Sequence, residues 1–215
     1  MIVNRTDAIA NFQFEDNVTN STGGTNGTVT GTTQYSNSIS GRAFDFDGST
    51  RIEYGNSGLS NSSDLTLLLR LNADTHTNGD KVFAKAGSTA EGFYLFVNSA
   101  ASDIYTWRVR NAADSAFVAV NITMPETQVY AIRCEIKLTN EITVSYYTTA
   151  GVLSTASTAF VDSTYASNAS NMSLGDLAGG NNGFDGKIDD FTVVTGLLTD
   201  EDFYRYYMGL GITDL

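Results

Sequence analysis

The chain has 215 residues and a formal net charge of −12 at pH 7, with one cysteine and one histidine. A domain of this size can bury a core without help from a metal, and a single cysteine excludes an internal disulfide. The negative charge excludes nucleic acid as a partner, since phosphate binding needs a basic face, and the lone histidine and cysteine exclude His–Cys and multi-His metal sites.

Apolar and polar residues alternate through most of the chain, which indicates strand after strand with polar turns between them. The predicted strands lie at 41–48, 50–54, 64–72, 81–85, 92–98, 104–110, 117–123, 129–138, 141–149, 152–160, 172–177 and 183–195. So many short strands predict an all-β fold, a two-sheet antiparallel sandwich. We find no linker and no internal repeat, so we expect a single domain over residues 1–215.

One short helix is predicted near 200–208. Thr199 can cap its acidic first turn, and Gly209 stands where a helix-ending glycine belongs. Phe203, Tyr206 and Tyr207 fall on one stripe at helical spacing. The stripe predicts that this helix packs against the sandwich as a lid.

Three single residues are assigned from the pattern around them. Cys134 shares the apolar face of an alternating strand, so it is predicted to be a core residue and not a nucleophile. Trp107 shares a face with Tyr105 and Val109, which also predicts a core position. His76 lies in a polar run, which predicts an exposed turn.

Several short segments follow one another along the chain in an order that is typical of a known family. The segment at 8–17 is a strand that ends in an acidic, Asn-containing loop, and Gly-Thr-Val follows at 27–29. Gly-Arg-Ala-Phe-Asp-Phe-Asp-Gly occupies 41–48, and Asp-Gly-Lys-Ile-Asp-Asp-Phe occupies 185–191 ahead of the helix. Together they resemble the laminin-G-like (LamG), concanavalin A-like superfamily of lectin and glucanase domains, over essentially the entire chain. The resemblance implies a jelly-roll sandwich.

One segment departs from that pattern. Relatives often carry an Asn-Arg-Ala-Leu-like turn before the helix, whereas this chain has Thr-Gly-Leu-Leu at 195–198. The departure leaves the fold expectation unchanged and loosens the assignment to a subgroup.

The resemblance also implies a structural calcium ion near the chain ends. Asp16, Asn17 and Asn20 lie in the first loop, and Asp189 and Asp190 lie in the last strand. The first and last strands of a sandwich tend to pair, so these oxygen ligands could meet, with only one of the two adjacent aspartates facing the ion unless a bulge intervenes. The alternative is that Asp16 and Asp190 cap turns and accept backbone hydrogen bonds.

Glycan binding needs an aromatic platform beside polar groups. The strand at 92–98 is apolar on both faces, so Tyr94 and Phe96 are candidates to line a groove on the face that the core does not cover. Tyr146 and Tyr147 are adjacent on one strand, so one of them must face outward and is a further candidate.

Catalysis is not expected. Glucanases of this shape resemble one another in a Glu-x-Asp-x-Glu strand, which this chain lacks. Glu135 and Glu141 straddle a turn, and the exposed face of the first strand also carries Arg133 and Lys137.

The sequence therefore predicts a non-enzymatic structural or adhesive module displayed on a particle surface, a bacteriophage virion protein of the head decoration, fibre or tail-associated kind. The alternative is a calcium-dependent carbohydrate-binding or adhesion domain of a secreted bacterial protein. The expected partners are other virion proteins or cell-surface glycans, with homo-oligomers a further option. Membrane insertion is not expected, because no run of 18 apolar residues occurs.

Overall fold

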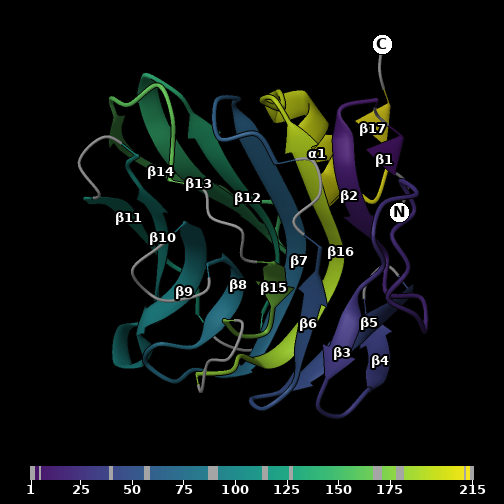
Figure 1. Cartoon of the computed structure of the whole chain (residues 1–215). Coiled ribbons are helices and arrows are strands. Elements are labelled where there is room, and N and C mark those ends of the chain that lie inside the picture. The colour runs from purple at the N-terminus through teal and green to yellow at the C-terminus, as the bar shows by residue number, and fades with distance from the viewer. Residues whose placement is uncertain are drawn as a thin grey trace.

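The computed structural model describes residues 3–4, 6–38, 41–55, 59–86, 92–112, 116–125, 128–166, 171–177, 182–210 and 212–213. These residues form two antiparallel sheets that pack face to face, with one short helix on the outside of one sheet (Figure 1). The predicted all-β sandwich is confirmed. Among the described residues, none of the helices is long and apolar enough to cross a membrane.

The larger sheet has eight strands and the smaller sheet has seven. The larger sheet runs β14 (Leu153–Phe160), β13 (Asn140–Thr148), β12 (Val129–Lys137), β7 (Leu65–Thr75), β16 (Asp185–Thr195), β5 (Gly41–Asp47) and β4 (Tyr35–Ser38), and β2 (Ala8–Phe12) also pairs with β16. The smaller sheet runs β11 (Phe117–Thr123), β10 (Ile104–Arg110), β9 (Phe93–Ser99), β8 (Lys81–Lys85), β15 (Met172–Leu174), β6 (Arg51–Tyr54) and β3 (Thr28–Thr30).

Four minor elements complete the described fold. The strands β1 (Val3–Asn4) and β17 (Ile212–Thr213) pair in parallel, a 3₁₀ turn η1 spans Ala100–Ser102, and the helix α1 spans Asp200–Tyr207. Figure 1 shows α1 lying over the larger sheet near β16 and β7.

The core lies between the sheets, where strand alternation puts every second side chain. Trp107 is 0% exposed, and its indole N–H donates to the carbonyl of Glu135 on the opposite sheet at 3.1 Å. Cys134 is also 0% exposed, so both predicted core positions are confirmed. Burial raises the pKa of the Cys134 thiol well above its usual value, which leaves it protonated and unreactive.

The helix α1 begins with a full capping box. The Thr199 hydroxyl accepts from the Asp202 backbone N–H, and the Asp202 side chain accepts from the Thr199 backbone N–H. Phe203 and Tyr206 are buried against a small apolar cluster on the outer face of the larger sheet that includes Leu68. The predicted helix and its packing as a lid are therefore confirmed.

A bulge interrupts the pairing of β16 with β7 between Asp189 and Thr192. Asp190 has a positive φ of 51°, a conformation that aspartate tolerates better than most residues. Asp189 lines a cavity on the outer face of the larger sheet, and Asp190 contacts Arg70 beneath α1. The bulge thus lets two adjacent aspartates serve the same face of the sheet.

His76 does not lie in an exposed turn, as its polar neighbours predicted. Its side chain is 0% exposed. The Nε2 atom lies 2.6 Å from the Tyr105 hydroxyl, and Nδ1 lies 3.3 Å from Asp103. The ring packs edge-on against Tyr105 at the end of the sandwich, a contact between distant segments that the local sequence does not reveal.

Candidate functional site

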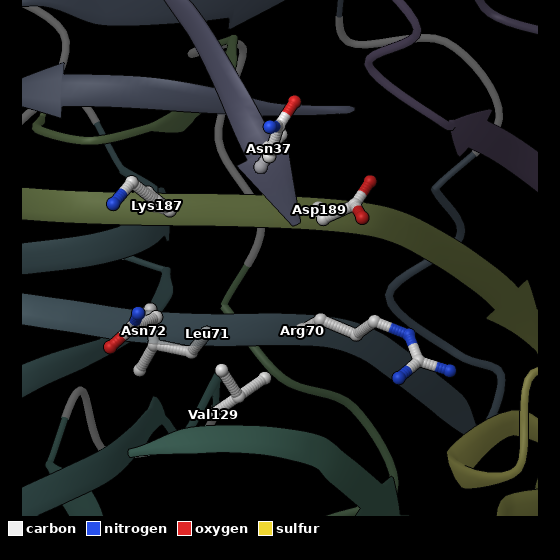
Figure 2. A pocket seen from close by; sticks show the side chains of 8 residues that line it. Asn37, Arg70, Leu71, Asn72, Val129, Lys187 and Asp189 are labelled. Carbon is white, nitrogen blue, oxygen red and sulfur yellow. The ribbon is translucent and has the colours of Figure 1, made fainter. Parts of the chain in front are cut away.

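A cavity of about 200 Å³ opens on the outer face of the larger sheet (Figure 2). Its lining comes from five neighbouring strands, β4, β5, β16, β7 and β12. The lining residues are Asn37, Ala43, Arg70, Leu71, Asn72, Val129, Lys187 and Asp189. Five of these eight residues are polar, and all five stand on strands rather than on loops.

Strand register explains how the polar groups come together. Arg70 and Asn72 are two residues apart on β7, and Lys187 and Asp189 are two residues apart on β16. Lys187 is the register partner of Asn72, and Asp189 is the partner of Arg70. Because side chains two apart share a face, both cross-strand pairs point outward while Leu71 belongs to the core.

The charged groups of this cavity have distinct partners. The Arg70 guanidinium turns toward α1, where Nε lies 3.2 Å from Asp190 and an N–H donates to the Tyr206 carbonyl at 2.7 Å. Figure 2 shows this head group pointing away from Asn72 and Lys187. The Lys187 ammonium lies 4.0 Å from the half-exposed Asp74 carboxylate, a long and weak pairing.

The amide of Asn72 is the most informative group in the cavity. Its Oδ1 is buried and accepts no hydrogen bond from the described residues. A buried acceptor without a donor costs about 1–3 kcal/mol, and a bound donor would recover that free energy once the amide turns its Oδ1 toward the cavity. The Lys187 side chain, on the residue paired with Asn72 across the strands, adds an ammonium group that can donate hydrogen bonds to a ligand.

A second cavity of about 210 Å³ adjoins the first. It is lined by Arg70, Val129, Ala131, Thr149, Tyr207 and Met208, so the two cavities share Arg70 and Val129. We call the joined cavities the groove. The groove runs from the polar pairs of β7 and β16 to the last turn of α1.

An aromatic surface forms the helix end of the groove. The Tyr207 ring stacks on the Tyr147 ring, with centroids 4.7 Å apart and planes 28° apart. The Tyr207 hydroxyl donates to the Thr149 carbonyl at 3.3 Å, and Met208 is 52% exposed beside it. The Tyr207 ring, backed by Tyr147, thus presents a fixed apolar platform next to the polar cavity.

The predicted tyrosine pair divides as expected, one in and one out. Tyr146 belongs to the core between the sheets, and its hydroxyl donates to the Thr123 carbonyl at 2.9 Å. Tyr147 faces outward and supports Tyr207 beneath α1. Neither ring is open to a ligand on its own, since each is 8% exposed.

Tyr94 and Phe96 lie on the outer face of the smaller sheet, away from the main core, as the sequence predicts. Tyr94 is 1% exposed under Leu177, and Phe96 is half-buried beside it. They are therefore not part of the groove, which lies on the other sheet.

The residues predicted to bind calcium have other partners. Asp16 pairs with Arg42 at 2.9 Å, and Asp190 pairs with Arg70. The Asn17 side chain bonds within its own loop, to Glu15 and Thr19.

The remaining two predicted ligands do not complete a calcium site. The Asn20 Oδ1 accepts from the Asn11 backbone N–H at 3.0 Å, and the Asp189 Oδ1 accepts from the next backbone N–H at 2.7 Å. Among the described residues, no three His, Cys, Asp or Glu side chains gather so as to hold a metal. The five residues as arranged do not fit a calcium ion, and calcium binding stays a prediction.

A third cavity, of about 160 Å³, contains Glu135 and Glu141. Burial raises the pKa of Glu135, and the neighbouring Arg133 opposes that rise from 3.3 Å away. Arg133 also pairs with Asp200 of α1 at 2.7 Å. The Glu135 carboxylate is thus tied into the ion pairs that fasten α1 to the sheet.

The sequence did not single out Asn72 and Lys187. Residues 64–72 are almost continuously apolar, yet Arg70 and Asn72 interrupt the apolar run at spacing two. That spacing was the available signal, because polar residues two apart share one face. Their pairing with Lys187 and Asp189 joins segments far apart in the chain.

Comparison with solved structures finds the same fold in several proteins. Domain 4 of AbnA, a GH43 extracellular arabinanase from Geobacillus stearothermophilus in complex with arabinotriose, has a TM-score of 0.72 and 18% identity over 92% of this chain and 96% of that one. The binding domain of Paraclostridial Mosquitocidal Protein 1 has a TM-score of 0.73 and 12% identity over 94% of this chain and 52% of that one.

The binding domain of botulinum neurotoxin DC in complex with SialylT matches with a TM-score of 0.71 and 10% identity, over 94% of this chain and 51% of that one. The chain thus spans about half the length of these toxin domains. Identities this low show the β-sandwich fold alone, and membership of the laminin-G-like group stays a prediction. No protein-family profile and no curated protein matches the chain.

Proposed function

We propose that this protein is a non-enzymatic carbohydrate-binding module and that the groove on the larger sheet holds a short oligosaccharide. The observation that carries the proposal is the groove itself, in which the cavity with the Asn72–Lys187 pair joins the cavity with the stacked Tyr207 platform through Arg70 and Val129. Sugar rings have hydroxyls at their edges and apolar C–H faces, so recognition needs both kinds of surface together.

The polar half of the groove suits hydroxyl groups. Each hydroxyl both donates and accepts, so it can donate to the Asn72 Oδ1 while it accepts from the Lys187 ammonium. The groups stand on paired strands rather than on loops, so little conformational entropy is lost when a ligand binds.

The structural neighbours support the proposal without establishing it. One neighbour was solved with arabinotriose and another with SialylT, and several are binding domains by name. The absence of catalysis is part of the proposal and has one support in the site: Glu135 is held by Arg133 in the ion pairs beneath α1.

A binding screen with matched variants tests the proposal. Purified protein would be screened against neutral oligosaccharides, including arabino-oligosaccharides, and the best ligand titrated by calorimetry. We expect Asn72→Ala, Lys187→Met and Tyr207→Ala each to weaken binding by about tenfold or more, the equivalent of one lost hydrogen bond or ring contact. Lys137→Met is the control, because Lys137 is exposed on β12 of the same sheet outside the groove.

Two outcomes contradict the proposal. One is that no neutral oligosaccharide binds to the wild type. The other is that a bound oligosaccharide keeps its affinity in all three groove variants.

The setting of the module is a separate proposal. We propose display on a bacteriophage virion, with a secreted bacterial protein as the alternative. Mass spectrometry of purified virions produced from the source genome tests this, and absence of the protein from the particles would favour the secreted alternative.

A further inference from the structure

Cations and aromatic rings gather on the outer face of the smaller sheet. They come from four neighbouring strands, β8, β9, β10 and β11. The residues are Lys81, Tyr94, Phe96, Arg108, Arg110 and Phe117. Three of the chain's 12 Lys and Arg residues thus stand together in a protein whose net charge is −12.

Arg108 is held in place by aromatic groups. Its guanidinium carbon lies 3.9 Å from the centroid of the Phe117 ring and 5.7 Å from that of Tyr94. One N–H donates to the Tyr94 hydroxyl at 3.0 Å. Stacking on a ring fixes the plane of a guanidinium and leaves donors at its edge for a ligand.

The charge of Arg108 is not neutralised by an acid within the described chain. Arg42, Arg51, Arg70 and Arg133 each form an ion pair with an Asp or Glu side chain. Among the described residues, Arg108 instead contacts the Tyr94 hydroxyl and aromatic rings. In so acidic a protein, an arginine without a carboxylate is a site where an external anion can bind.

Lys81 adds a second positive charge to the same face. Its ammonium lies 4.9 Å from the Phe96 ring and donates to the Gly79 carbonyl. Burial lowers the pKa of Lys81, and the charge of Arg108 lowers it further, against the opposing effects of Asp176 and Asp80. An anion bound at Arg108 would relieve the repulsion between the two cations.

Groups suited to sugar hydroxyls lie next to Arg108 on the same face. The Thr106 hydroxyl donates to the Asn121 Oδ1 at 2.6 Å. This bond fixes the amide with its N–H groups pointing away from Thr106. Ala119, the register partner of Arg108, is exposed and small, so it leaves room above the sheet between Phe117 and Asn121.

We propose that this face is a second binding site, selective for an acidic sugar, with the sugar carboxylate paired to Arg108 and its hydroxyls near Asn121. The fixed guanidinium matches a carboxylate with two parallel hydrogen bonds. The inference rests on the proposed function in taking the ligand to be a carbohydrate. It concerns the opposite sheet from the groove, so each can fail without the other.

The test compares acidic and neutral sugars on the whole chain. Sialyllactose and oligogalacturonate would be titrated beside lactose and neutral oligosaccharides, at low and high salt. We expect acidic sugars to bind more tightly than neutral ones of equal length, and more weakly as salt rises. Arg108→Met should lower acidic-sugar affinity by tenfold or more, and Arg108→Lys should restore little of it, because an ammonium cannot form the paired contact.

Controls separate the two sites. Arg205→Met removes an exposed arginine on α1 and should change nothing, and Asn72→Ala should leave acidic-sugar binding intact. Equal affinity of acidic and neutral sugars, or unchanged acidic-sugar affinity in Arg108→Met, overturns the inference while leaving the groove untouched. Binding of poly-glutamate as tight as that of oligogalacturonate, and equally dependent on Arg108, would also overturn it in favour of an acidic-peptide site.

Discussion

Asp190→Asn should destabilise the protein far more than the same substitution at Asp16. Both aspartates have positive φ, 51° and 57°, and each accepts from the Nε of an arginine. Asparagine tolerates this backbone conformation as well as aspartate does, so the two substitutions differ only in the surroundings of the lost charge.

Burial decides the magnitude. The side chains of Asp190 and Arg70 are 2% and 4% exposed, whereas those of Asp16 and Arg42 are 64% and 37% exposed. Removing one partner of a buried pair leaves the other charge without compensation and costs about 3–5 kcal/mol. An exposed pair contributes about 0–1 kcal/mol. The N–O distances alone, 3.2 Å for the buried pair and 2.9 Å for the exposed one, would predict the larger loss of stability for the exposed pair.

Urea denaturation measures both variants against the wild type. For a slope of about 3 kcal/mol per molar, Asp190→Asn should lower the midpoint by about 1 M or more and Asp16→Asn by at most about 0.3 M. Arg70→Met combined with Asp190→Asn should cost less than the sum of the single variants, because neither charge is then left alone. Equal losses at Asp16 and Asp190 would refute the reasoning.

Three further predictions concern titration, metal and catalysis. Burial lowers the pKa of Lys85 from 10.5 to about 8, so the unfolded chain binds more protons between these values and stability rises with pH across that window. Denaturant titrations should find this rise in the wild type and not in Lys85→Met. The arrangement in which Asp190 is paired with Arg70 predicts the same melting midpoint in millimolar calcium and in EDTA; a rise in calcium that Asp189→Asn abolishes would instead support the calcium site that the sequence predicts. Glu135→Gln and Glu141→Gln should leave reducing-end release from β-glucans at the blank level of the wild type, and steady release by the wild type would show that the protein is an enzyme.

Much of the fold could be predicted because local alternation is strong. The strands predicted at 81–85, 104–110 and 117–123 coincide with β8, β10 and β11, where apolar residues recur and polar turns intervene. The strand predicted at 172–177 instead ends at Leu174, because Gly175 adopts a φ of +81°. The strand β4 was not predicted, since Tyr-Ser-Asn-Ser offers no apolar alternation.

The candidate site was less predictable, because it depends on register between distant strands. Asp189 and Asp190 were recognised as neighbours near the last strand, but the bulge that turns both to one face is a tertiary feature. Asn72 and Lys187 are separated by most of the chain and become partners only once β7 and β16 pair. Single-sequence patterns fix which face a side chain takes, and not which residue lies across from it.

The groove itself follows from the size of the side chains on the outer face of the larger sheet. Ala43 on β5 and Ala131 on β12 are small outward residues, and Arg70 between them is drawn aside to Asp190 and the last carbonyls of α1. The Arg70 side chain, which would otherwise cover the sheet between the two alanines, thus holds the helix instead. The helix in turn supplies Tyr207, which lines one end of the groove. The ion pair that fastens α1 and the opening beside it are therefore two consequences of one arrangement, so the stability of Arg70–Asp190 and the affinity of the groove should change together.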